Sequence, residues 1–174
     1  DTGERVKTSV SQHLEFIRTR KNQHPESFAQ LVRFSKWWVR QIKQREDPDF
    51  RFKSFMVELL WAHLADRGYH LNDYTVALEN FFGYIVKSRL QERVAFTDFY
   101  SASELPSATG AEIEIFDPVN SENNVAATYT SQQRQAIVDA AQDAYDAVSQ
   151  AQYEDGKGDS VDLWQIVFGP RFRG

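Results

Sequence analysis

Apolar residues recur every three or four positions through much of the first half of the chain, which is the spacing of a helix that buries one face. The clearest stretch begins near Pro25, because proline is tolerated in a first helical turn, and ends near Arg45. Its inward stripe contains Phe28, Leu31, Val32, Ser35, Trp38, Val39 and Ile42. Similar stripes predict three more helices, over residues 11–22, 53–67 and 73–90.

The pattern changes after Arg93, where loop-forming residues predominate and only Glu112–Phe116 alternates as a short strand does. Thr130 and Gln133 have the spacing of a capping box, which predicts the start of a helix that ends near residue 150. The apolar, aromatic tail over residues 161–172 is expected to pack back on the body. We therefore expect a mainly α lobe of five helices with at most a short strand, covering residues 11–174, after an extended lead-in over residues 1–10.

Composition narrows the possible functions. The 174 residues suffice for one domain, and the absence of cysteine excludes disulfides, thiolate metal sites and cysteine nucleophiles. No apolar run approaches the roughly 20 residues that span a bilayer, and the first residues do not resemble a signal peptide. These features predict a cytoplasmic protein that does not interact with membranes.

Charge is unevenly distributed along the chain, although the net charge is only −5. Residues 18–53 contain ten basic and four acidic residues, whereas residues 98–162 contain thirteen acidic and two basic ones. The basic part should attract anions. A single basic region suits a small, highly charged ligand at least as well as it suits a nucleic acid.

Four basic residues share one face of the helix predicted after Pro25, because their spacing is three, four and three: Arg33, Lys36, Arg40 and Lys43. The simpler interpretation of this face is a solvated helix surface. The sharper interpretation is a phosphate site, with lysine as a point charge.

Lys53-Ser54-Phe55 stands at the predicted start of the next helix. A helix start presents free N–H groups and partial positive charge, so a cation and a hydroxyl there suit phosphate, and an aromatic ring suits a base. Ser54 could instead be an ordinary N-cap and Phe55 a core residue.

The remaining candidates for catalysis are weak, so we predict no catalytic and no metal-binding residue. Asp47-Pro48-Asp49 has the form of a two-metal carboxylate pair, but it lies in a predicted loop with no strand before it and no Gly-Ser pair. His63 falls on an apolar helix face and is expected to be a core histidine. A metal site made of His63, Asp66 and His70 is disfavoured because Gly68 breaks the helix between them.

Three segments, in order, resemble the oligoadenylate synthetase and cGAMP-synthase group, whose bacterial members are the CD-NTases. LVRFSKWW (31–38) resembles L-x-R-L-x-K-x-W, and KSFMVELL (53–60) resembles [K/P]-S-[Y/F]-x-x-E-L-L. FDPVNSENNVA (116–126) resembles the late turn D-P-x-[N/D]-P-x-N-N-V-A and is the most specific of the three. The final helix and tail are also similar, so the resemblance extends from about Thr8 to Phe172.

The resemblance implies roles for individual residues. At the position of Lys36 the group binds the donor triphosphate, at Ser54 it hydrogen-bonds a phosphate, and at Phe55 it stacks a base, usually on tyrosine. Lys53 and Arg33 are included in the same nucleotide-binding site.

Three residues match the late turn of the group: Asp117, Asn120 and Asn124. We expect them to be mainly structural, because Asp and Asn bind nearby backbone in such turns.

The group's catalytic carboxylates lie on a sheet in an N-terminal lobe after a Gly-Ser pair, and this chain contains no Gly-Ser pair. The resemblance thus implies a C-terminal helical lobe whose missing N-terminal lobe binds Mg²⁺. Since nucleotidyl transfer depends on the metals and their carboxylates, the chain alone should not catalyse.

The intact protein implied by this resemblance uses ATP or another nucleoside triphosphate to make cyclic or linear oligonucleotide messengers in anti-phage defence. Its expected partners are its own N-terminal lobe and a regulatory protein of the defence operon. One alternative is an independent helical module that binds nucleic acid or a protein, with steep salt dependence in the nucleic-acid case. Another is a lobe of a tRNA-tailing or poly(A)-type nucleotidyltransferase.

Overall fold

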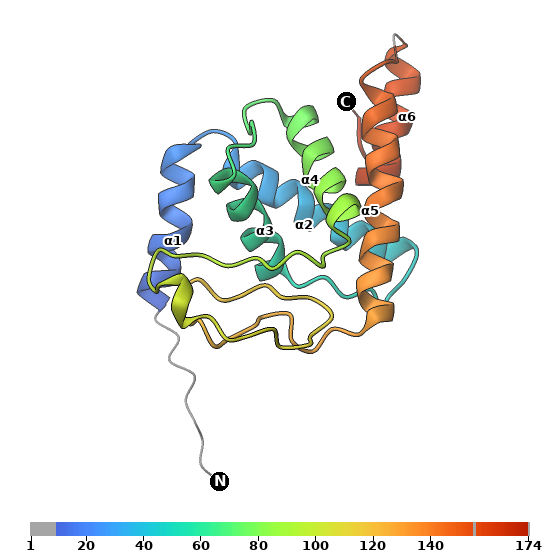
Figure 1. Ribbon diagram of the computed structural model, residues 1–174. Coiled ribbons are helices and arrows are strands. Elements are labelled where there is room, and N and C mark those ends of the chain that lie inside the picture. Colours follow the sequence, from blue (N-terminus) through green and yellow to red (C-terminus); the bar gives the residue numbers. More distant parts are fainter. Residues whose placement is uncertain (1–9, 155, 174) are drawn as a thin grey trace.

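The computed structural model describes residues 10–154 and 156–173. Within them the chain forms six α-helices, one 3-10 turn and no strand, which confirms the expected mainly α lobe (Figure 1). The elements are α1 (Val10–Gln23), α2 (Phe28–Arg45), α3 (Ser54–Asp66), α4 (Tyr74–Ser88), the 3-10 turn (Ala102–Glu104), α5 (Ser131–Ala151) and α6 (Lys157–Phe168). The expected lead-in falls on residues 1–10, of which residues 1–9 lie outside the described part.

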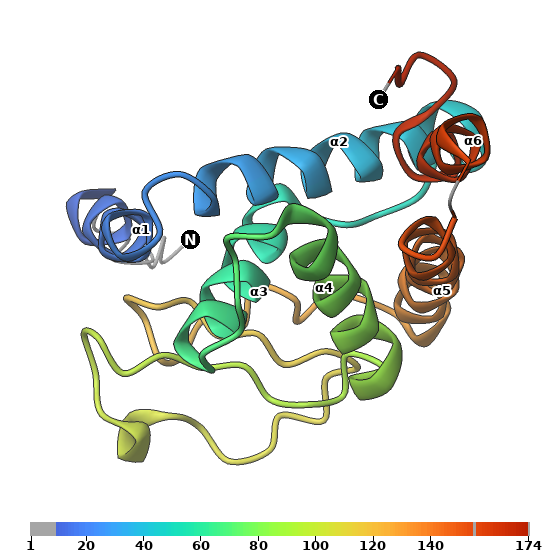
Figure 2. The same ribbon diagram turned by 90° about the horizontal axis from the view of Figure 1, so that it is seen from above.

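Helix α2 connects the two sides of the lobe. It runs across one face of the molecule from α1 to α6, with α3 and α4 beneath it (Figure 2), and it contacts all four of these helices. Every residue of its predicted apolar stripe is buried. α5 packs against both α4 and α6 and closes the side far from α1.

The structure differs from the sequence-based expectation at three places. α2 begins at Phe28 because residues 24–27, including Pro25, form a turn. The expected tail contains most of a sixth helix, α6, which the five predicted helices did not include. The expected strand Glu112–Phe116 is reduced to two isolated bridges, which join Ile115 to Val94 and Phe116 to Asn124.

The local signals at helix ends are present as predicted. The Thr130 hydroxyl accepts a hydrogen bond from the Gln133 N–H (3.2 Å), and the Gln133 side chain accepts one from the Thr130 N–H (3.2 Å), which completes the capping box. Gly68 follows α3 with a φ of +77°, the left-handed conformation in which glycine commonly ends a helix.

The long segment between α4 and α5 has little regular structure and runs along the lower side of the lobe in Figure 1. Ion pairs and side-chain bonds to backbone stabilise it. Arg93 donates to Glu114 (2.6 Å) and to the Pro106 carbonyl (2.9 Å), and Glu114 also accepts from the backbone (2.7 Å) and hydroxyl (2.6 Å) of Thr109. This segment leads directly into the late turn. None of the described helices is both long and apolar enough to cross a membrane.

A buried guanidinium ties α1 to the rest of the lobe. Arg20 donates to Asp66 at the end of α3 (3.1 and 2.6 Å) and to both carboxylate oxygens of Asp98, while its guanidinium carbon lies 3.9 Å from the centre of the Phe16 ring. Burial alone would lower the pKa of Arg20, but the hydrogen bonds to the two carboxylates outweigh it and raise the pKa. The guanidinium therefore stays charged and holds α1 in place.

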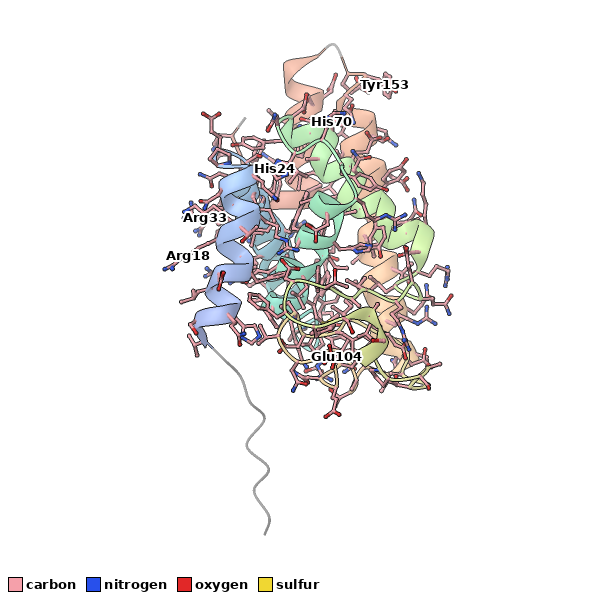
Figure 3. All side chains as sticks on the ribbon, turned by 60° about the vertical axis from the view of Figure 1, so that its left-hand side comes forward. Arg18, His24, Arg33, His70, Glu104 and Tyr153 are labelled. Atoms are coloured by element: carbon pink, nitrogen blue, oxygen red, sulfur yellow. The ribbon has the colours of Figure 1, made fainter. Side chains whose placement is uncertain are left out.

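We predict that Arg20→Met lowers the free energy of unfolding by about 2 kcal/mol, because it removes hydrogen bonds from a buried cation to two carboxylates that are partly exposed, at 39% and 25%. Chemical unfolding in urea measures this. Arg18→Ala serves as the control, since Arg18 is exposed and points away from the body (Figure 3), and it should change stability by at most about 0.5 kcal/mol. Equal effects of the two substitutions would contradict the role of Arg20.

Glu114 should make stability depend on pH in the acid range. Its hydrogen bonds to Arg93 and Thr109 lower its pKa from 4.5 to about 2. A lowered folded-state pKa means that the ionised group stabilises the fold above pH 4.5 and that this contribution is lost as the pH falls towards 2.

We therefore expect Glu114→Gln to flatten the pH dependence of unfolding free energy in this window, measured by urea titrations at several acid pH values. Glu112→Gln is the control, because Glu112 is more exposed (42% against 16%) and lies two residues away. A slope that survives Glu114→Gln unchanged would exclude Glu114 as its source.

Candidate functional site

Ser54 is the first residue of α3, and the start of this helix is open. The N–H groups of a first helical turn have no partner within the helix, so a helix start attracts anions. Among the described residues no side chain caps α3, its first turn contains no acidic residue, and Ser54 is exposed. This helix start can therefore accept a phosphate.

Lys36 is brought towards this helix start by an ion pair between helices. Its ammonium group on α2 donates to Glu58 on α3, and both side chains are partly exposed, at 34% and 26%. Glu58 lies four residues after Ser54, which puts the two on the same helix face about one turn apart. The Lys36 ammonium thus contacts α3 about one turn after Ser54, on the helix face that Ser54 shares.

Phe55 is half-buried beside Ser54 and packs against the core. Its ring meets the His13 ring edge-on, with ring centres 5.6 Å apart and planes at 69°. His13 comes from α1, and nothing in the local sequence indicates that it contacts Phe55. The contact restricts how the Phe55 ring can turn.

Lys53 is engaged by a segment far along the chain. Its ammonium group donates to the Val125 carbonyl (2.7 Å), and its backbone N–H donates to the Tyr129 hydroxyl (3.0 Å). Burial, followed by the nearby positive charge of Arg51, lowers the pKa of Lys53. Arg51 itself donates to the backbone (3.0 Å) and hydroxyl (2.7 Å) of Thr128 and lies over the Tyr129 ring. These contacts make Lys53 an anchor for α3 more than a free cation.

Arg33 does not join the other predicted site residues. It is exposed on the outer surface (Figure 3), and its guanidinium contacts Gln30 (3.3 Å) on its own helix. It lines a cavity of about 670 Å³ between α2, α4 and the C-terminal end, and Lys36, Ser54 and Phe55 do not line this cavity. Its other walls are largely aromatic and include Phe34, Trp37, Tyr74, Trp164, Phe168 and Phe172.

The residues of the late turn all bind backbone. The Asn120 side chain accepts from the Glu122 N–H (3.1 Å). The Asn124 side chain donates to the Ile113 carbonyl (2.8 Å) and accepts from the Ile115 N–H (3.1 Å) and the Ala126 N–H (3.0 Å). The amide of Asn124 thereby adds side-chain hydrogen bonds to the backbone bonds that this segment makes with Val94 and Val125.

Asp117 is the most enclosed member of this turn, at 2% exposure. Its carboxylate accepts from the Val119 N–H (2.9 Å), from the Asn123 side-chain amide (3.1 Å) and from Nε2 of His13 (2.8 Å). A buried carboxylate is costly unless it is hydrogen-bonded, and these partners meet that requirement. Asp117 thus links the late turn to α1.

The sequence candidates for a metal site are placed as follows. Asp47 accepts a hydrogen bond from the Asp49 N–H (2.9 Å) within a loop, as an aspartate in a turn commonly does. His63 is partly buried beside the Tyr84 ring, and its pKa is lowered first by burial and then by Arg67. No group of three or more His, Asp or Glu residues in the described ranges could hold a metal ion.

Comparison with known proteins gives both curated relatives and solved structures. No family model matches the chain. The chain is 47% identical over 174 residues to the cyclic AMP-AMP-AMP synthase of Escherichia coli strain MS 115-1, and 30% identical over 171 residues to the CBASS oligonucleotide cyclase CdnC of Escherichia coli strain KTE188. It spans about half the length of these relatives, 54% and 50%.

The structural matches agree with the sequence matches. CdnC of E. coli MS115-1 has been solved with ATP and in a complex with HORMA-deltaN. Each match has a TM-score of 0.92 and 47% identity, and covers 96% of this chain and 52% of the solved one. The chain is thus similar to one lobe of a bacterial CD-NTase, which confirms the predicted resemblance. More particularly, its relatives are CBASS oligonucleotide cyclases of the CdnC kind.

Proposed function

We propose that the chain is the C-terminal, donor-nucleotide-binding lobe of a nucleotidyltransferase that makes cyclic or linear oligonucleotide messengers from nucleoside triphosphates in anti-phage defence. The observation that carries this proposal is the ion pair of Lys36 with Glu58, one turn after Ser54 at the open start of α3, with the Phe55 ring next to Ser54. The similarity to half of a cyclic AMP-AMP-AMP synthase, and to a CdnC solved with ATP, supports it.

The chemistry of the three residues suits a nucleoside triphosphate. The Ser54 hydroxyl and the free N–H groups of the first turn of α3 would donate to phosphate oxygens, and the Lys36 ammonium would add a full positive charge. The Phe55 ring would stack on the base, although it lacks the hydroxyl of the tyrosine usual in the group. In this proposal Glu58 holds the Lys36 side chain towards the helix start before the nucleotide binds.

The described residues bind and orient the donor, and the chemical step is assigned to another part of the protein. Mg²⁺ would supply charge stabilisation at the phosphates, but the described residues include no set of ligands that fits it. We therefore propose that the metal binds to an N-terminal lobe, and that the residues of this chain take no part in the catalytic step. What the chain contributes is positioning, which lowers the entropic part of the barrier.

A regulatory protein is a second proposed partner, supported by the relative solved in a complex with HORMA-deltaN. The similarity to CBASS cyclases favours messenger synthesis over a tRNA-tailing enzyme and over an independent binding module. The ion pair of Lys36 and the anchored ammonium of Lys53 also leave fewer free cations for a nucleic-acid surface.

The test is donor affinity in the full-length protein that contains this chain. We expect Lys36→Ala and Ser54→Ala each to weaken binding of a non-hydrolysable ATP analogue about 10- to 100-fold, because a hydrogen bond to a charged group contributes about 1.5–3 kcal/mol. Isothermal titration calorimetry with Mg²⁺ present gives the affinity.

Lys87→Ala is the matched control, because Lys87 is an exposed lysine on α4 and should leave affinity unchanged. A loss of folding stability should not account for weaker binding in Lys36→Ala, since a partly exposed pair such as Lys36–Glu58 contributes at most about 1 kcal/mol to the free energy of unfolding. Unchanged affinity in both Lys36→Ala and Ser54→Ala would contradict the proposed site.

A further inference from the structure

We infer that the late turn positions the base-stacking ring: buried Asp117 fixes His13, and His13 fixes the orientation of Phe55. The inference rests on the proposed function, because Phe55 needs a defined orientation only if it stacks on a base. It gives the late turn a role in the site beyond stabilising its own backbone. His13 and Asp117 are positioning residues in this account and do not touch the nucleotide.

Asp117 is held rigidly within the late turn. Its carboxylate is 2% exposed, and the three donors described above hold it. Its backbone is held as well, because its N–H donates to the Asn123 carbonyl (2.8 Å). Backbone and side chain are thus fixed within one short turn, so Asp117 is a firm anchor for whatever donates to it from outside.

His13 connects Asp117 to α1. His13 lies 104 residues before Asp117 in the chain, and its Nε2 lies 2.8 Å from the carboxylate oxygen. This hydrogen bond fixes the plane of the imidazole. A charge-assisted bond to a buried carboxylate is among the stronger hydrogen bonds in proteins, so the ring has little freedom left.

The His13 ring in turn contacts the Phe55 ring. The imidazole meets Phe55 edge-on at 5.6 Å, an arrangement that aromatic pairs favour. Because Phe55 is only half-buried, the core alone does not enclose its ring. The His13 ring supplies a further wall, which selects one phenyl orientation before any base arrives.

The segment between α4 and α5, which contains the late turn, also contacts the residue just before this helix start. Val125 and Tyr129 bind the side chain and backbone of Lys53, the residue that immediately precedes Ser54. In Figure 1 the segment between α4 and α5 passes along the lower side of the lobe, beneath α3. The segment between α4 and α5 therefore contacts the start of α3 in two ways. It reaches Phe55 indirectly, through His13, and it binds Lys53 directly.

Fixing the ring in advance should strengthen binding of the base and leave binding of the phosphates unchanged. Ordering a flexible side chain on binding costs affinity, and removing that cost is equivalent to about a three- to tenfold gain. The base-dependent part of affinity therefore reports on His13, and the phosphate-dependent part reports on Lys36 and Ser54.

The experiment compares two probes on the full-length protein: a non-hydrolysable ATP analogue and inorganic triphosphate. We expect His13→Ala to weaken the ATP analogue about three- to tenfold and to leave inorganic triphosphate within about twofold. His13→Gln retains a donor for Asp117 but no ring, so it should protect the fold and still weaken the ATP analogue. Asn120→Ala is the control within the turn, because the Asn120 side chain bonds the nearby Glu122 backbone and not His13 or Asp117 in any contact described above.

Equal losses for both probes in His13→Gln, or no loss for either, would overturn the positioning role. Phe55→Ala separates this failure from a failure of the proposed function. If Phe55→Ala weakens the ATP analogue and His13→Ala does not, the positioning inference alone is wrong. If Phe55→Ala has no effect, the proposed stacking is wrong.

Discussion

The buried carboxylate of Asp117 is the constraint on which the arrangement of the site depends. An ionised carboxylate at 2% exposure is tolerable only when donors surround it, and the chain supplies them from its own turn and from α1. The requirement to satisfy one buried charge thereby brings the first described helix to a turn more than a hundred residues later. His13 is the residue that joins the two, and it lies against the ring beside the start of α3.

Two other sets of ion pairs hold α1 and α2 against α3. Arg20 binds α1 to the end of α3 and to Asp98, so α1 is held at both of its ends. Glu58 directs the Lys36 ammonium of α2 towards α3. The three candidate ligands of a nucleotide thus come from α2 and α3. The residues that contact them come from α1 and from α3 itself, and α1 is held in turn by the segment between α4 and α5.

Much of the fold could be predicted because its signals are local. The apolar stripe of α2 and the Thr130 capping box depend on residues within one or two turns of each other. α6 was missed as a helix because two glycines precede and open it, yet Trp164 and Phe168 stack within it and it packs on α5 and α2. The expected Glu112–Phe116 strand is reduced to isolated bridges, and the Asn124 side chain bonds the backbone of Ile113 and Ile115 beside them.

The site was predictable only in part. Lys36 contacts α3 through Glu58, one turn after Ser54, whereas Arg33, one turn away from Lys36 on the same face, lines the aromatic cavity. Helix periodicity identifies a shared face and does not determine which neighbour each side chain meets. His13 and Tyr129 could not be found from local patterns, because their partners lie about 104 and 76 residues away in the sequence.

A crystal structure of the full-length protein with Mg²⁺ and a non-hydrolysable ATP analogue tests the central claim most directly. The account predicts density for the triphosphate at Ser54 and the Lys36 ammonium, with the adenine ring against Phe55. A nucleotide bound without these residues, for example in the aromatic cavity lined by Trp37 and Trp164, would contradict it.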